Sequence, residues 1–229
     1  MKFVLIYVIV LLALLANEVL SKPRKKKEKN VCENKALTDG KQRPEGSCSK
    51  TIQGIIPSSD KMTSSLIISP KNGAVLDSNK PFNVEVVIHN LETGFFSDPE
   101  TQYYLEPQTV NSNGLVKGHS HVTIQKIDGL NPPNAKNFEF FEGLNKKAKA
   151  GHLVVKVVSK NGTPGLPAGK YRICTMSSSF THQPLLMPVA KRGAQDDCIR
   201  ITVKECEEKE KKEEKKKEKG GKKRTLMAI

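Results

Sequence analysis

Alternating hydrophobic and polar positions in the middle of the chain predict β-strands. In residues 82–90, Phe82, Val84, Val86 and Ile88 fall on one face of an extended segment. Short strands separated by turns are typical of sandwiches, so we predict an all-β fold, an immunoglobulin-like β-sandwich. Further strands are predicted at 65–69, 119–126, 138–141, 152–158, 170–176, 185–189 and 198–203, with one short helix at 145–150.

The N-terminus carries a different pattern, an unbroken apolar run over residues 3–16 that follows Lys2. Together with the small-residue exit at Ser21, this run predicts a secretory signal peptide over residues 1–21. A membrane-spanning helix needs about 20 apolar residues, and this run is shorter, so no membrane span is expected. The chain is therefore predicted to be secreted, extracellular or in the cell wall.

Charge divides the rest of the chain into a central domain and two arms. The formal net charge is +14, of which residues 22–31 carry +5 and residues 204–224 carry +4. Segments with so few apolar residues have little to bury, so we expect a basic disordered arm at 22–31 and a Lys/Glu-rich disordered tail at 204–229. One β-sandwich domain is expected at 32–203.

The basic arms favour an anionic partner, such as an acidic polymer of a cell wall or cell surface. Nucleic acid is not favoured, because the chain has no Trp, few aromatic residues and a tail that mixes Glu with Lys. Oligomeric state cannot be read from the sequence.

Five cysteines in a secreted chain predict two disulfides and one remaining thiol. Cys174 and Cys198 lie in two late strands joined by a loop, which favours a bridge between them. Cys32 is left to pair with Cys48 or with Cys206. A metal role for the cysteines is not favoured, since no Cys-x-x-Cys spacing occurs.

Histidines supply the main candidate chemistry. Strand alternation places His119 and His121 on one face, while Val122 and Ile124 commit the other face to the core, so the two imidazoles are expected to face the surface. His182 lies in a loop that can fold over that face. Three imidazoles are a common ligand set for copper or zinc. The set would be closed by water or by one of three side chains, Gln125, Asp196 or Asp197. The alternative is a hydrogen-bonded polar face without metal.

Two kinds of function remain open from these residues. The first is a non-catalytic binding protein of unknown ligand, in which aromatic side chains stack on a ligand beside Gln125; the aromatic candidates are Phe95, Phe96, Tyr103 and Tyr104. The second is an extracellular copper- or zinc-dependent enzyme that uses the three histidines. We favour the binding protein, because no common hydrolase or nucleotide-binding motif occurs.

Two known metal-enzyme patterns match only in part. A cupin would place Glu near Gln125 and a third His near Arg172. A copper polysaccharide monooxygenase would begin its mature chain with His, where Lys22 is expected here.

Several blocks of sequence resemble a known family. They occur in the order Ile56-Pro57-Ser58-Ser59-Asp60-Lys61-Met62, Asn90-Leu91-Glu92-Thr93-Gly94-Phe95-Phe96, Pro99-Glu100-Thr101-Gln102-Tyr103-Tyr104, residues 118–125, Gly165-Leu166-Pro167-Ala168-Gly169-Lys170-Tyr171-Arg172 and His182-Gln183-Pro184. This series is similar to that of a family of small secreted fungal proteins of unassigned function, over residues 56–203. The resemblance implies an extracellular fungal protein and supplies no mechanism.

Overall fold

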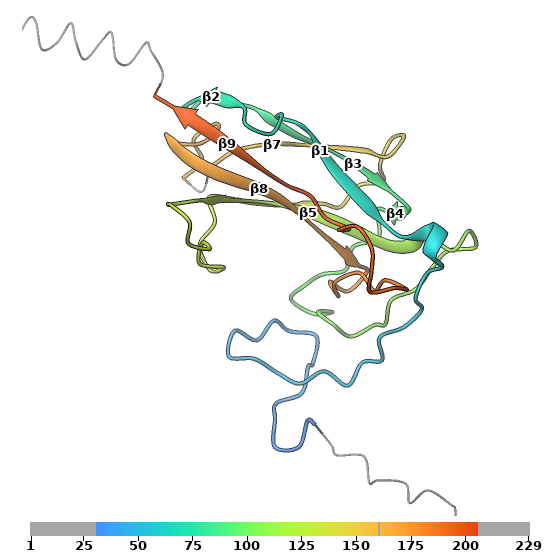
Figure 1. The fold of residues 1–229 in the computed structure, drawn as a ribbon. Helices are drawn as coiled ribbons and strands as arrows, with labels where there is room; N and C mark the ends of the chain where they lie inside the picture. Colours follow the sequence, from blue (N-terminus) through green and yellow to red (C-terminus); the bar gives the residue numbers. More distant parts are fainter. Residues whose placement is uncertain (1–30, 160, 206–229) are drawn as a thin grey trace, which may run out of the picture. The chain divides into compact units, whose positions relative to one another are not determined.

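The computed structural model describes residues 31–159 and 161–205. Nine strands and one short 3-10 helix, η1 (Ser59–Lys61), make up its regular structure (Figure 1). Residues 31–36 belong to one compact unit, and the chain from Leu37 onward belongs to another. The predicted signal peptide and almost all of both charged arms lie outside the described residues.

A three-stranded antiparallel sheet is formed by β1 (Ser64–Ser69), β3 (Asn83–His89) and β7 (His152–Lys156), with β3 in the middle. The alternation in β3 determines which face of this sheet packs against the core, since Val84, Val86 and Ile88 are all buried. Their hydrophobic side chains therefore point to the core of the protein.

The second sheet has six strands. Its order is β2 (Val75–Asp77), β9 (Cys198–Lys204), β8 (Gly169–Ser179), β5 (Val116–Lys126) and β4 (Leu91–Thr93), and β6 (Phe140–Leu144) also pairs with β5. The long β5 and β8 run antiparallel from Gly118 opposite Ser179 to Lys126 opposite Tyr171. The β2–β9 and β4–β5 pairs are parallel. This register places β5 inside the sheet.

Both sheets contribute to one hydrophobic core. It contains Val84 and Val86 from β3, Val122 and Ile124 from β5, and Tyr171 from β8, none of which exposes measurable side-chain surface. Burial of apolar surface of this kind is the main force that stabilises two packed sheets. The predicted all-β fold is confirmed, while a detailed match to immunoglobulin connectivity stays a prediction.

Two predicted elements are wrong. Residues 185–189 form no strand, because the Leu186 amide donates its hydrogen bond to the side chain of Gln108. Residues 145–150 form a connection and no helix. There the Ala148 amide donates to Thr93 Oγ1 at 2.7 Å, a bond that fixes the connection against β4.

Two disulfides stabilise the chain and indicate an oxidising environment. Cys174 and Cys198 lie opposite each other on β8 and β9 and are bonded, which is the pairing that the sequence favours. Cys32 and Cys48 are each disulfide-bonded as well. The described part of the chain contains no helix long and apolar enough to cross a membrane.

Candidate metal centre

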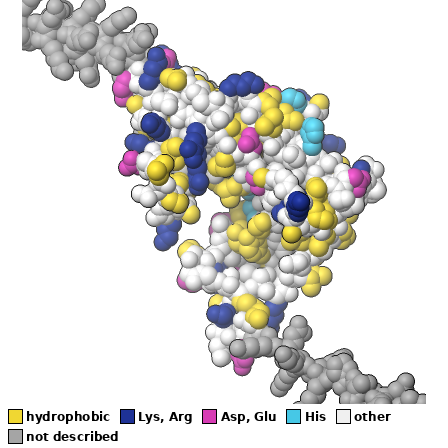
Figure 2. Space-filling model, viewed as in Figure 1, with side chains coloured by type: hydrophobic (Ala, Val, Ile, Leu, Met, Phe, Trp, Pro, Cys, Tyr) yellow, Lys and Arg dark blue, Asp and Glu magenta, His cyan; other side chains and the backbone are white. Residues whose placement is uncertain are grey.

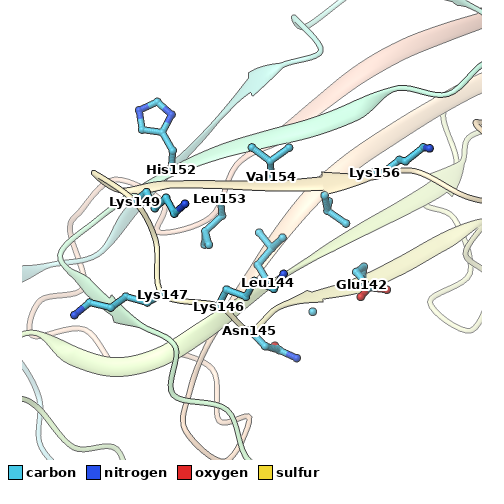
Figure 3. Close-up of a pocket in the computed structure, with 12 residues that line it drawn as sticks. Glu142, Leu144, Asn145, Lys146, Lys147, Lys149, His152, Leu153, Val154 and Lys156 are labelled. Carbon is cyan, nitrogen blue, oxygen red and sulfur yellow. The ribbon is translucent and has the colours of Figure 1, made fainter.

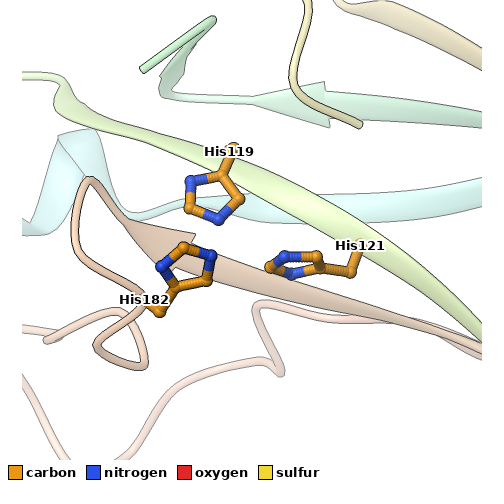
Figure 4. Close-up of side chains that lie close together, drawn as sticks. All are labelled: His119, His121 and His182. Atoms are coloured by element: carbon orange, nitrogen blue, oxygen red, sulfur yellow. The ribbon is translucent and has the colours of Figure 1, made fainter. Parts of the chain in front are cut away.

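Three histidines meet on the outer face of the six-stranded sheet (Figure 4). His119 and His121 project from β5, and His182 projects toward them from the segment that follows β8. One potential ligand nitrogen on each ring lies within 4.8 Å of those on the other two. The structure therefore brings together all three histidines named from the sequence.

The outer face is covered, which the sequence did not predict. His119 is fully buried and His121 is only 6% exposed, although Val122 and Ile124 on the opposite face of the same strand are buried too. The ring of Phe96 packs edge-on against His119, with ring centroids 5.0 Å apart. The prediction that the two imidazoles face the surface is wrong, because other segments of the chain cover this face.

Hydrogen bonds orient the two imidazoles of β5. His119 Nδ1 lies 2.9 Å from the Phe95 carbonyl oxygen, and His121 Nδ1 lies 3.1 Å from the Met176 carbonyl oxygen. A carbonyl oxygen only accepts, so each Nδ1 carries the proton and donates it. In the neutral rings this leaves both Nε2 atoms with a free lone pair, the arrangement that metal-ligating histidines usually show.

Two ring nitrogens of the cluster are buried without a hydrogen-bond partner. These are His119 Nε2 and His182 Nδ1. A buried polar atom without a partner costs roughly 1–3 kcal/mol, so most such atoms in proteins are paired. Because His119 Nδ1 donates to Phe95, His119 Nε2 carries a lone pair that a ligand accepting electron pairs would satisfy.

Burial keeps the three rings neutral. Desolvation, followed by the nearby His121, lowers the pKa of His119 to about 3. The same two causes in the same order lower the pKa of His182 to about 4, and burial also lowers the pKa of His121. Neutral imidazole is the form that binds a metal, so the site needs no proton loss at neutral pH.

The position of His182 depends on a tight turn after β8. Its amide donates to the Ser179 carbonyl at 3.1 Å, and its backbone has a left-handed φ of 71°. The preceding Thr181 is fully buried, and its hydroxyl donates to the Glu106 carbonyl at 2.8 Å. The turn is therefore anchored to the 97–106 segment, and it presents the imidazole to β5.

A cavity of about 310 Å³ opens beside the cluster. Its walls include His121 and His182, the aromatic rings of Phe96, Tyr103 and Phe141, and the uncharged polar side chains of Gln42, Asn145 and Ser178. None of the described residues that line it carries a carboxylate or an ammonium group. The Phe141 ring stacks on His121 at 5.1 Å between centroids.

The side chains proposed to complete the ligand set are engaged elsewhere. Gln125 Oε1 accepts two hydrogen bonds from Arg172, at 2.6 and 3.0 Å, and its amide nitrogen donates to carbonyls of the 134–137 segment. Asp196 accepts from the Ser177 amide, and Asp197 accepts from the Ile67 amide. These contacts hold the three side chains in place, and neither aspartate belongs to the histidine cluster, although the Asp196 carboxylate acts electrostatically on His121.

Only two of the four aromatic candidates line the cavity. Phe96 and Tyr103 do, with the Tyr103 ring 5.8 Å from that of His182. The Tyr104 ring does not line the cavity and stacks on the Tyr103 ring, with centroids 4.2 Å apart. Phe95 contributes its carbonyl to His119, while its ring lies under the Lys117 ammonium at 5.3 Å.

Sequence reasoning missed Met176, which lines the same cavity. It lies on β8 directly opposite His121. Paired residues of an antiparallel sheet place their side chains on the same face, so the register between the two strands would have found it. That register could not be read from sequence alone.

A larger cleft, of about 420 Å³, lies where β6, the 145–149 connection and β7 meet (Figure 3). Its floor includes Leu144 and Leu153, both buried. Four exposed lysines border it: Lys146, Lys147, Lys149 and Lys156. Elsewhere lysine and arginine side chains are spread over the visible surface (Figure 2).

The fold and the cluster define an all-β protein with two sheets and a buried group of three imidazoles on one outer face. Residues 65–204 match the model of the CLU5d N-terminal domain, and the chain belongs to this family. Together with the fungal relative described next, this match confirms the resemblance to a fungal family of unassigned function.

The chain is similar to a curated fungal relative, "Pathogenicity cluster 5 protein d" of Colletotrichum graminicola. The two are 46% identical over 179 residues, which cover 76% of this chain and 36% of the relative. The chain thus spans about a third of the length of that relative. No solved structure matches the chain.

Proposed function

We propose that this protein is an extracellular fungal protein that binds one transition-metal ion, copper or zinc, through His119, His121 and His182. The observation that carries the proposal is the convergence of three neutral imidazoles within 4.8 Å, two of which have buried, unpartnered nitrogens. Packing alone gives no reason to bury those nitrogens without partners.

The three nitrogens are near the spacing that a metal ion requires. At metal–nitrogen distances of about 2.0–2.1 Å, tetrahedral ligand nitrogens lie roughly 3.3 Å apart. The present separations, all within 4.8 Å, would have to shorten by up to about 1.5 Å for the three nitrogens to bind one ion. The carbonyls of Phe95 and Met176 would hold the protonated Nδ1 atoms of the two strand histidines, as partners of metal-bound histidines commonly do.

Three further features support the extracellular setting. The first is the apolar N-terminal run with the pattern of a signal peptide. The second is the pair of disulfides, which persist in oxidising compartments. The third is the relative's name, which assigns that protein to a pathogenicity cluster.

The test is the metal content of the full chain, expressed for secretion, stripped with a chelator and reloaded with Zn²⁺ or copper. We expect one ion per chain after dialysis, and none in His182→Asn. Asn tolerates the left-handed backbone of this position, so the turn should persist. The matched control is His89→Asn, at an exposed histidine outside the cluster. Equal metal content in all three proteins, or none in any of them, would refute the proposal.

A second function is favoured by the lysine-bordered cleft, which suits an acidic polysaccharide. The connection that carries three of the lysines is held by the bond from Ala148 to Thr93 and by paired backbone bonds between Lys149 and His152. Among the described residues that line the cleft, four positive charges, against the single carboxylate of Glu142, lie beside an apolar floor and complement a chain of sugar rings that bear carboxylates.

Retention on polygalacturonate tests this second function. Replacing Lys146, Lys147 and Lys149 by Gln should weaken binding about tenfold at low salt. Each exposed charge contact contributes a fraction of a kcal/mol, and three of them together account for about one factor of ten in affinity. The control variant replaces Lys71, Lys136 and Lys191 by Gln. These lysines are also exposed but lie outside the cleft, so the two variants have the same net charge. Equal losses in both variants would show that net charge, and not the cleft, retains the polymer.

A further inference from the structure

Met176 is placed to serve the histidine cluster. It lies opposite His121 in the β5–β8 register, and its carbonyl accepts the Nδ1 proton of that histidine. Its side chain lines the cavity beside His121 and His182, and it is 47% exposed. A methionine left half in solvent within a sheet gains little from packing, whereas its thioether sulfur is a soft metal ligand.

Charge distinguishes among the ions that three imidazoles can bind. An imidazole ligand carries no charge of its own, and the described residues that line the cavity include no carboxylate or thiolate. The carboxylates of Asp196 and Asp98 act on His121 and His182 from outside that lining. The desolvation cost of an ion grows with the square of its charge, so a divalent ion costs about four times as much as a monovalent one of similar size. The ligands themselves therefore add no negative charge, and a thioether beside three imidazoles favours soft monovalent copper.

We infer that the site selects monovalent copper, with the Met176 thioether as fourth ligand beside His119, His121 and His182. This inference rests on the proposed metal-binding function and adds the identity of the ion and of its fourth ligand. Zinc in a site with three histidines would instead take its fourth ligand from water. Among the described residues that line the cavity, Met176 alone offers sulfur.

The experiment is an anaerobic titration of the full chain with Cu(I) in competition with the chromophoric chelator bicinchoninate, with a parallel Zn²⁺ titration. Met176→Leu conserves volume at a half-exposed position, so the fold should persist. We expect this variant to bind Cu(I) about tenfold or more weakly, while its Zn²⁺ affinity stays within about twofold. Met62→Leu, at a methionine outside the cavity, should match the wild type for both ions.

The outcomes separate the two proposals. Tight Cu(I) binding that depends on Met176 supports the inference. If the wild type and Met176→Leu bind Cu(I) with equal affinity, or if the wild type binds Zn²⁺ more tightly than Cu(I), the inference is overturned. The proposed metal site would still hold in either case. Binding of neither ion by the wild type overturns both.

Discussion

Replacing His119 by Leu should remove the response to metal while leaving the metal-free protein nearly as stable. His119 is fully buried, and its Nε2 atom has no partner, so the metal-free fold already bears a penalty of roughly 1–3 kcal/mol at this position. Leu removes that penalty and has nearly the volume of histidine. It also gives up the hydrogen bond to the Phe95 carbonyl.

The gain from removing the unpartnered nitrogen is opposed by the lost hydrogen bond and by the larger side chain. Loss of a hydrogen bond costs about 0.5–1.5 kcal/mol net, and more where the carbonyl stays buried. Adding a slightly larger side chain to a packed site costs about 1 kcal/mol. The free energy of unfolding of metal-free His119→Leu should therefore lie within about 2 kcal/mol of the wild-type value. A typical buried polar-to-apolar exchange without an unpartnered atom would cost more.

The metal-bound protein should behave differently. An ion present at about 100 times its Kd stabilises the native state by about 2.7 kcal/mol. Each kcal/mol shifts the Tm of a domain of this size by about 2–4 °C, so the wild type should gain about 5–11 °C. His119→Leu should gain less than about 1 °C, because two imidazoles bind an ion far more weakly than three.

Differential scanning calorimetry of the wild type, His119→Leu and His89→Leu, each with and without metal, measures both quantities. His89 is exposed and lies outside the cluster, so His89→Leu should keep the full response. A full metal response in His119→Leu would show that the ion binds elsewhere. A loss of more than about 4 kcal/mol in metal-free His119→Leu would show that histidine is required there for packing, against the reasoning above.

Three further predictions concern the framework of the site. Gly118→Ala should destabilise the protein by about 2–4 kcal/mol and weaken metal binding, because a Cβ there would lie 2.0 Å from the Ser178 carbonyl oxygen. Urea unfolding measures the loss of stability, and an unchanged midpoint would contradict this prediction. Cys174→Ser with Cys198→Ser should cost about 3.5 kcal/mol on the loop-entropy estimate for a separation of 24 residues, and a loss below about 1 kcal/mol would contradict that estimate. Burial raises the pKa of Tyr171 to about 12, so its contribution is complete below pH 10, its ordinary value, and is lost as pH rises through about 12. Tyr171→Phe should have a flatter stability profile between those pH values, measured by chemical denaturation, and an identical profile would refute the assignment.

The sequence predicts most of the sheet framework, because its signal is local. The alternation in β3 and the apolar positions Val122 and Ile124 of β5 each mark a face that is buried in the structure. The strands β2 and β4 have three residues each, which is too short for a period to be read. The register that sets Met176 opposite His121 depends on contacts between distant segments.

The candidate site was only half predictable for a related reason. A two-residue spacing on one strand places His119 and His121 on one face, and this can be read directly. Whether that face meets solvent depends on the 94–104 and 180–187 segments, which have no periodic pattern. Phe96 and the turn at Thr181 cover the face through contacts that the sequence does not encode locally.

Burial of this face makes the histidine pair more informative about a bound ligand. On an exposed strand, imidazole nitrogens bond to water at no cost, and a His-x-His pair carries little information. Here His119 Nε2 and His182 Nδ1 are both buried and unpartnered, at a combined cost of roughly 2–6 kcal/mol. Apolar side chains of similar size would fill the same space without that cost. Stability alone would favour those side chains, which supports the proposal of a bound ion, and the calorimetric comparison of His119→Leu with the wild type measures that difference.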